Sequence, residues 1–156
     1  MKVQRSIEIA ALPNKIWPYL IEPDKILKWY IPMHKFEYTG EQRSGVGTSF
    51  YSEEKAGGRL MKLNFVATEW VENEKLAFRM TSGNFVKGYD QRWTTEPTLS
   101  GSRFTFAEDV KLPYGIIGKI MGVFARSSSE AHVKEMLARL KLFAELKESN
   151  VPAKGG

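Results

Sequence analysis

Apolar and polar residues alternate over residues 3–9, and this period of two predicts a first strand. Pro13 then opens a short helix, because proline fits the first helical turn, where its missing N–H is not needed. A second short helix is expected from Pro23 to about Trp29 or Tyr30. The chain therefore begins with one strand followed by two short helices.

From residue 34 onward the pattern changes to a meander of alternating segments. Strands are expected at residues 34–39, 47–55, 59–71, 75–81, 86–96 and 102–111, separated by turn residues such as Ala56-Gly57-Gly58 and Glu72-Asn73-Glu74. A strand of about ten residues spans about 33 Å, so an antiparallel sheet of such strands must twist and curl. A curled sheet has a concave face that another element must cover.

Side chains two residues apart on a strand point to the same side of the sheet. The phase that is richest in large apolar groups predicts a ligand-lining set on the concave face: Phe50, Leu63, Phe65, Phe78, Tyr89, Gln91, Trp93, Phe104 and Phe106. Polar side chains in the same phase are candidates to orient the polar end of a ligand. These are Gln91, Glu108 and His34, with Tyr89 as a further donor.

The last third of the chain predicts one long amphipathic helix with a break in its apolar phase. Ile117, Met121 and Phe124 share one face and are added to the candidate ligand-lining set. The apolar residues from Val133 onward share a face turned by well over 90°, as counted at about 100° per residue. We expect a kink, a π-bulge or a short interruption within residues 125–131. The alternative is a continuous helix whose first half covers the mouth of a cavity.

These elements predict an α+β fold, in which a curved seven-stranded antiparallel sheet wraps around the long C-terminal helix. Residues 1–149 are expected to form a single domain, and residues 150–156 a frayed tail. One helix cannot fill a wide curved sheet, so a cavity of about 300 Å³ or more is expected between them. The competing interpretation is that the aromatic side chains simply form a packed core.

Composition narrows the chemistry. The 156 residues include no cysteine, which excludes disulfides, thiolate metal sites and cysteine nucleophiles. The net charge of +5 is spread among alternating acids and bases, so no nucleic-acid partner is expected, while transient membrane contact stays open. No signal sequence or long apolar run is found, and a cytoplasmic location is expected.

Candidate catalytic groups are few. The two histidines, His34 and His132, lie far apart in the sequence and lack metal-ligand spacing, so neither a metal site nor a cofactor is expected. No Gly-x-Ser-x-Gly elbow is present. Glu108 and His34 are weak catalytic candidates: a carboxyl group buried beside Phe106 would have a raised pKa and could exchange protons. The alternative for Glu108 is that a bulge in its strand exposes it to solvent.

The chain resembles the START-like (SRPBCC) superfamily, whose members share the helix-grip fold, and is most similar to bacterial polyketide cyclase/dehydrase-like proteins. The resemblance covers about residues 2–148 and is carried by short segments: Ile7 to Trp17, Trp29, Gly45-Val46-Gly47, Arg92-Trp93, Gly101-Ser102-Arg103 and Leu112 to Gly118. It implies the helix-grip fold. It does not choose among the superfamily's functions, because one scaffold hosts carriers, cyclases, receptors and chaperone activators.

Three functions follow from this reasoning. The first is binding, with or without transport, of a hydrophobic or aromatic small molecule such as a lipid, isoprenoid or polyketide-like compound. The second is a cofactor-free cyclase or dehydratase in which Glu108 or His34 moves protons. The third is a chaperone or membrane-associated accessory protein that uses the face around Met121. The sequence leaves turnover, the ligand and the oligomeric state open.

Overall fold

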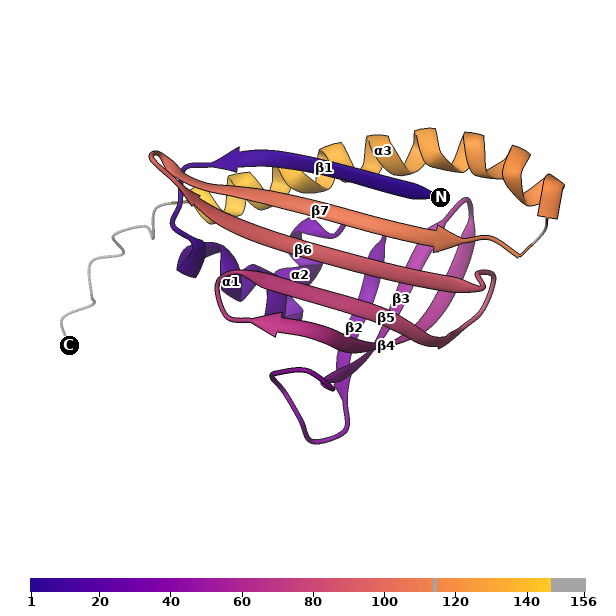
Figure 1. The fold of residues 1–156 in the computed structure, drawn as a ribbon, viewed down its shortest axis with the longest axis horizontal. Helices are drawn as coiled ribbons and strands as arrows, with labels where there is room; N and C mark the ends of the chain where they lie inside the picture. The colour runs from indigo at the N-terminus through magenta and orange to yellow at the C-terminus, as the bar shows by residue number, and fades with distance from the viewer. Residues whose placement is uncertain (114, 147–156) are drawn as a thin grey trace, which may run out of the picture.

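The computed structural model describes residues 1–113 and 115–146, with side chains described for residues 1–113 and 129–146. The expected order of one strand, two short helices, six strands and one long helix is confirmed (Figure 1). The elements are β1 (Lys2–Ile9), α1 (Pro13–Ile21), α2 (Pro23–Trp29), β2 (Met33–Thr39), β3 (Ser49–Ala56), β4 (Arg59–Val71), β5 (Lys75–Gly83), β6 (Gly88–Thr98), β7 (Gly101–Lys111) and α3 (Gly115–Glu145).

All seven strands form one antiparallel sheet in the order β1-β7-β6-β5-β4-β3-β2. Only the placement of β1 beside β7 joins segments that are distant in sequence; every other neighbour is a hairpin partner. The pairing is shifted at three places, between Met33 and Lys35 and at two points along β4. Such irregularities bend a strand and increase its twist. The result is the predicted α+β helix-grip fold, a curved sheet with α3 running along it (Figure 1).

Two turns show why particular residues stand where they do. Gly101 begins β7 with a φ of 148°, and a Cβ added there would lie 2.3 Å from the carbonyl oxygen of Ile9. Only glycine therefore lets β7 approach the end of β1 so closely. Asn73, in the tight turn between β4 and β5, has a φ of 64°, a conformation that asparagine tolerates better than most residues.

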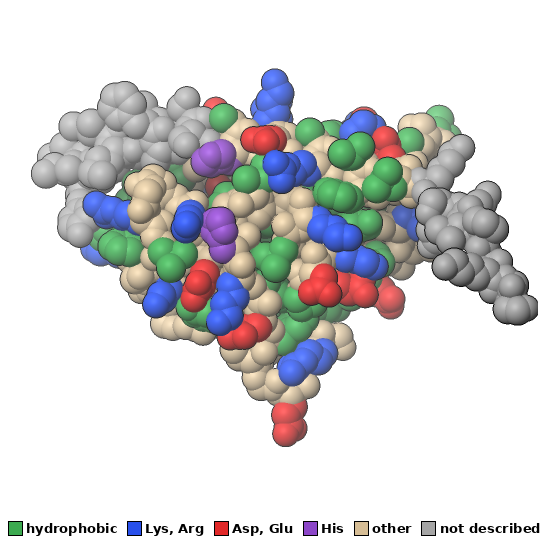
Figure 2. Space-filling model, turned by 180° about the vertical axis from the view of Figure 1, so that it is seen from behind, with side chains coloured by type: hydrophobic (Ala, Val, Ile, Leu, Met, Phe, Trp, Pro, Cys, Tyr) green, Lys and Arg blue, Asp and Glu red, His purple; other side chains and the backbone are tan. Residues whose placement is uncertain are grey.

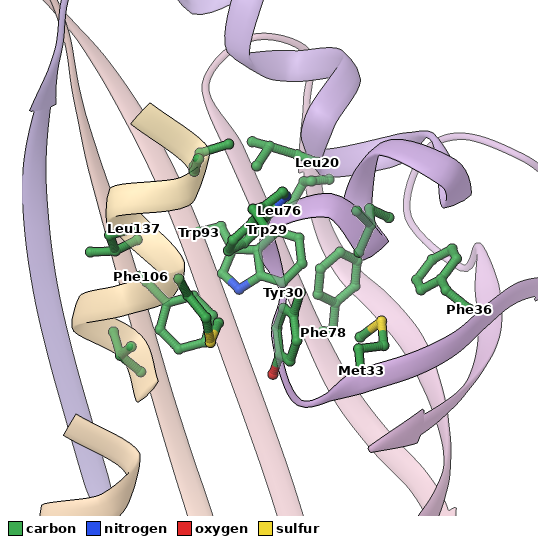
Figure 3. Close-up of a cluster of buried hydrophobic side chains, with 14 of the residues drawn as sticks. Leu20, Trp29, Tyr30, Met33, Phe36, Leu76, Phe78, Trp93, Phe106 and Leu137 are labelled. Carbon is green, nitrogen blue, oxygen red and sulfur yellow. The ribbon is translucent and has the colours of Figure 1, made fainter. Parts of the chain in front are cut away.

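The core lies where α2 meets the concave face of the sheet. Trp29 is fully buried and its ring lies 5.3 Å from that of Trp93 and 6.0 Å from that of Phe104. Tyr30 follows directly, with its ring 6.0 Å from that of Phe106. Figure 3 shows α2 inserting these side chains among those of the strands. Aromatic pairs at such distances and tilted angles add stability beyond their buried area.

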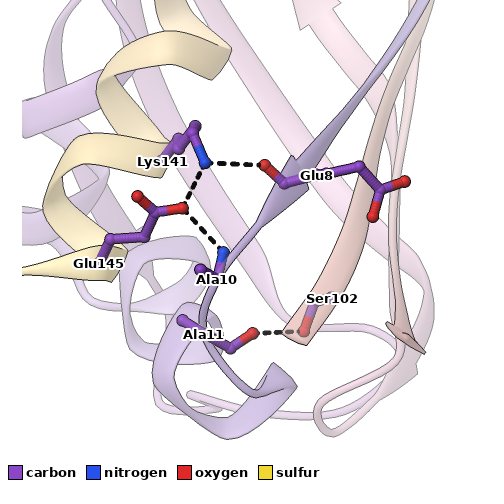
Figure 4. A network of polar contacts seen from close by, with 6 residues as sticks. All are labelled: Glu8, Ala10, Ala11, Ser102, Lys141 and Glu145. Atoms are coloured by element: carbon purple, nitrogen blue, oxygen red, sulfur yellow. Dashed lines mark hydrogen bonds and ion pairs between the residues drawn. The ribbon is translucent and has the colours of Figure 1, made fainter. Parts of the chain in front are cut away.

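Helix α3 is a single continuous α-helix from Gly115 to Glu145, so the expected interruption or π-bulge within residues 125–131 is wrong. Its apolar face from Val133 to Leu140 is buried in the core. Its last turn is tied to the end of β1: Glu145 Oε1 accepts a 2.7 Å hydrogen bond from the backbone N–H of Ala10 and pairs with Lys141 (Figure 4). Within the described residues, no helix is both long and apolar enough to span a membrane.

Candidate ligand site beneath the C-terminal helix

A hollow of about 140 Å³ lies between the middle of α3 and one end of the sheet. Its walls come from the end of β3, the start of β4, the start of β6, the end of β7 and one face of α3. The side chains that line it are mostly apolar and include Pro32, Met61, Val86, Val110, Leu112, Val133 and Met136. Its polar lining is concentrated in Tyr30, Glu54, Tyr89 and Glu108, with Ser129 and His132 contributed by α3.

The polar groups at this hollow form a chain of hydrogen bonds. Gln91 Nε2 donates to the Tyr30 hydroxyl over 2.9 Å, and the hydroxyls of Tyr30 and Tyr89 lie 3.1 Å apart. Tyr89 donates over 2.6 Å to Glu108 Oε2. Figure 3 shows the Tyr30 hydroxyl pointing away from the aromatic cluster that holds its ring. Tyr30 and Tyr89 thus link Gln91 to the Glu108 carboxylate through consecutive hydrogen bonds.

Glu54 is the second carboxyl group of the cluster and is held more loosely. Its side chain is 2% exposed, yet its contacts are long: 3.5 Å from the Tyr30 hydroxyl to Oε2 and 3.4 Å from the Ser52 hydroxyl to Oε1. Good O–H···O hydrogen bonds measure about 2.5–3.0 Å. Glu54 therefore keeps hydrogen-bonding capacity for another group.

The pKa of Glu54 is raised to about 8, mainly by burial and also by the nearby Glu108 carboxylate. Burial also raises the pKa of Glu108, although the hydrogen bond from Tyr89 and the Met1 ammonium group oppose this. Burial raises the pKa of both tyrosine hydroxyls well above their usual range. At neutral pH, the tyrosines are therefore proton donors and Glu54 is mainly a neutral carboxylic acid.

The two carboxyl groups consequently differ in chemistry. Burial raises the pKa of Glu108, and the short hydrogen bond from Tyr89 opposes this by favouring the carboxylate, the form that can accept a proton or bind a donor. Glu54 carries a proton that it can donate. Pairs of acids whose environments separate their protonation states are the usual basis of acid–base catalysis at neutral pH, and they also bind ligands with both donors and acceptors.

The structure brings Gln91, Tyr89 and Glu108 together, as expected from their common phase. Glu108 pairs regularly with Val3 and Gln91, so the alternative of a bulge that exposes it is wrong. The other strand residues of the candidate set lie in the packed core, each at most 5% exposed: Phe50, Leu63, Phe65, Phe78, Trp93, Phe104 and Phe106. None of these seven lines the hollow.

In the centre of the sheet, α2 fills the space with Trp29 and Tyr30, and the hollow beneath α3 measures about 140 Å³; the cavity of about 300 Å³ or more stays a prediction. His34 was expected on the concave face of the sheet, and this expectation is wrong. The register shift between Met33 and Lys35 turns it outward, and its side chain is exposed. Both histidines are visible on the surface in Figure 2. The side chains of Ile117, Met121 and Phe124 lie outside the described residues.

Three polar residues of the cluster were missed in the sequence. Ser52 and Glu54 stand two and four residues beyond Phe50, so they share its phase and the signal for them was present. Tyr30 follows the last residue of α2, where neither helical nor strand periodicity predicts direction. Its place at the hollow depends on how α2 docks on the sheet.

The described residues contain no group of three or more histidine, aspartate or glutamate side chains that could hold a metal ion. Wider depressions lie on the outer face of the sheet and between α1 and the end of α3. On the outer face, Arg79 pairs with Asp90 over 3.0 Å, so these charges already have partners. The hollow beneath α3 combines buried acids with an apolar wall among the residues whose side chains are described.

A family model described as polyketide cyclase/dehydrase and lipid transport matches residues 1–145. The chain belongs to this family. Members of the polyketide cyclase/dehydrase and lipid transport family have the START-like fold, so the resemblance seen in the sequence is confirmed. None of the curated proteins compared matches the chain.

Solved structures share the family fold at low sequence identity. A Thermus thermophilus protein superposes with a TM-score of 0.78 at 16% identity, covering 92% of this chain and 97% of its own. A START superfamily protein from Mycobacterium smegmatis gives 0.74 at 14% identity, with 90% and 97% covered. The Zhui aromatase/cyclase of a Streptomyces species gives 0.71 at 18% identity, with 100% and 98% covered. These likenesses establish the fold.

Proposed function

We propose that the chain binds a hydrophobic or aromatic small molecule in the hollow beneath α3, with the polar group of the molecule against the Glu54–Tyr30–Tyr89–Glu108 cluster. One observation supports this function above the others. Two buried carboxyl groups and two buried hydroxyls meet at an apolar hollow, and Glu54 has only long hydrogen bonds there. Buried polar groups without good partners are costly, so such a cluster is expected where a ligand completes it.

The volume of the hollow limits how much of a ligand can be enclosed beneath α3. At about 140 Å³ it is close to the engineered apolar cavity of about 150 Å³ that accepts benzene. One aromatic ring or a short branched chain therefore fits beneath α3. Any longer part of the molecule extends past the exposed rim residues Lys55, Ala56 and His132.

Filling the hollow tests this function. Benzyl alcohol is a ring-sized probe with one hydroxyl, and its binding can be followed by ligand-observed NMR and isothermal titration calorimetry. Val133→Phe places extra bulk into the hollow, and we expect it to weaken binding at least tenfold. Leu142→Phe on the same helix is the matched control, because Leu142 is exposed and away from the hollow. Saturable binding that is equal in wild type and Val133→Phe would contradict this placement.

Enzymatic turnover is the second candidate, and the unequal pair of carboxyl groups favours it. In this proposal the Glu108 carboxylate removes a proton next to a carbonyl group, while Tyr30 or Glu54 donates a hydrogen bond to the carbonyl oxygen. The resulting enolate, stabilised by that hydrogen bond, then regains a proton at carbon from the protonated Glu108. Enolisation of this kind is a first step of carbon–carbon ring closure, and positioned acids and bases accelerate such proton transfers by about 10²–10⁴-fold.

Acetophenone, a ring-sized ketone, provides the readout. In D₂O, wild-type protein is expected to accelerate exchange of the methyl protons, as seen by the loss of their NMR signal. Glu108→Gln should lower the acceleration by roughly 100-fold while retaining binding. Asp109→Asn, the neighbouring and more exposed carboxylate, is the control. Binding without any acceleration in wild type would leave a carrier and exclude this enzymatic function.

A further inference from the structure

No basic side chain within residues 1–113 and 129–146 neutralises the acids at the hollow. Among the described residues, neither Glu54 nor Glu108 takes part in an ion pair. The Met1 ammonium group is near, but it donates over 2.7 Å to the carbonyl oxygen of Val110 and lies 3.6 Å from Asp109. Buried carboxyl groups are ordinarily paired with a cation.

The other charged or titratable groups at the hollow lie at its rim. Lys55 follows Glu54 on β3 but is exposed, as a strand places neighbouring side chains on opposite faces. His132 lines the hollow from α3 and is also exposed. The side chains that shift the pKa of Glu54 are Glu108, which raises it, and Ser52 and Tyr30, whose hydrogen bonds lower it. The floor of the hollow therefore carries two carboxyl groups, while Lys55 and His132 face solvent and the Met1 ammonium group donates to the carbonyl oxygen of Val110.

We infer that the hollow beneath α3 selects a cationic amine, carried on a ring-sized apolar group, over neutral and anionic molecules of the same size. This inference rests on the proposed function and names the ligand class for the same site. An ammonium group at the cluster would donate to Glu54, whose present contacts measure 3.4 and 3.5 Å, and would face Glu108. A carboxylate ligand would instead place a third acid there.

Binding of an amine also has a definite proton balance. The free protein carries a proton on Glu54 at neutral pH, because its pKa is about 8. When an ammonium ion enters, its charge favours the Glu54 carboxylate, and the Glu54 proton leaves to solvent. Up to one proton is therefore released for each amine bound near pH 7. Affinity should rise as the pH approaches 8, because less of the free protein must give up that proton.

Three probes that share one ring test the charge preference: benzylamine, benzyl alcohol and benzoate. Each is titrated calorimetrically at pH 7 in two buffers with different ionisation enthalpies, so that proton release is measured together with affinity. We expect benzylamine to bind at least about tenfold more tightly than benzyl alcohol, since charged hydrogen bonds are stronger than neutral ones. Up to one proton should be released, and benzoate should show no saturable binding.

Glu54→Gln should remove the proton release and the preference for benzylamine, so that the variant binds benzylamine no more tightly than benzyl alcohol. Glu53→Gln is the matched control, because Glu53 is half-buried on the opposite face of β3 and does not line the hollow. Equal or tighter binding of benzyl alcohol, or saturable binding of benzoate, would overturn the amine preference and leave the proposed function standing. Failure of all three probes to bind would instead contradict the proposed function itself.

Discussion

The two ends of the concave face are built from the same strands and differ in what they hold. Along β6, Trp93 lies in the packed end, while Tyr89 lines the hollow. Along β7, the buried series runs from Phe104 through Phe106 to Glu108. The packed end is closed by α2, and the hollow end lies beneath the middle of α3. Strand phase therefore decides which side chains face inward, but the docked helix decides whether they become core or site.

The largest contrast should come from removing the ring that closes the packed end. Trp29→Ala deletes a fully buried indole that contacts Trp93 and Phe104, and it is expected to lower the free energy of unfolding by about 3–5 kcal/mol. Urea denaturation measures this loss. Leu99→Ala, at a fully exposed turn position, should change stability by less than about 0.5 kcal/mol. A Trp29→Ala loss below about 1 kcal/mol would mean that this end is not a packed core.

At the hollow end, the stability of the protein should depend on the protonation of Glu54. Its pKa is about 8 in the folded protein against an ordinary value of 4.5, so folding holds a proton that the unfolded chain releases. This stabilisation is fully present below about pH 4.5 and is lost as the pH rises through about 8. The slope between these limits is at most about 1.4 kcal/mol per pH unit.

Glu54→Gln should flatten that pH dependence and raise the melting temperature at pH 8 relative to wild type. Glu53→Gln should keep the wild-type profile. Thermal unfolding at several pH values measures both variants. Stability of the wild-type protein that is constant or rising between pH 5 and pH 8, with Glu54→Gln behaving identically, would show that Glu54 is ionised in the fold.

A smaller effect is expected from the hydrogen bond between the tyrosine chain and Glu108. Tyr89→Phe removes the 2.6 Å donor and should cost about 1.5–3 kcal/mol at pH 7, the range for hydrogen bonds to charged groups. The pKa of Glu108 should rise further, because that bond favours its carboxylate. Tyr51→Phe is a matched control, since Tyr51 makes a 2.8 Å bond to Glu53 outside the concave face. Equal losses in both variants would argue against a special role for the buried pair.

The smallest effect should appear where the last turn of α3 is tied to β1. Glu145→Gln weakens the pairing with Lys141 and the bond from Ala10, and a cost of about 0–1 kcal/mol is expected because the pair is partly exposed. Hydrogen exchange at the Ala10 amide should speed up, while exchange in β6 should not change. A loss above about 2 kcal/mol would mean that this contact positions the whole helix.

Strand periodicity is strict, so the sequence predicted which strand side chains face the concave side and are buried there. Tyr89, Gln91 and Glu108 were identified from phase alone, and Glu54 could have been found from its phase with Phe50. Strand periodicity gave the wrong side of the sheet for His34, because a register shift after Met33 turns this side chain outward. The sequence also did not predict that Trp29 and Tyr30 occupy the centre of the concave face through the docking of α2. That docking is a long-range event which no local pattern predicts.

Methyl NMR with benzyl alcohol tests most directly whether the hollow end, and not the packed end, is the ligand site. If the hollow end is the ligand site, saturable shifts are expected for the methyl signals of residues that line it: Met61, Val110, Val133 and Met136. The methyl signals of Leu20, Ile26 and Leu76, buried at the packed end, should stay unchanged. Shifts confined to Leu20, Ile26 and Leu76, or an absence of saturable shifts at the hollow, would contradict it.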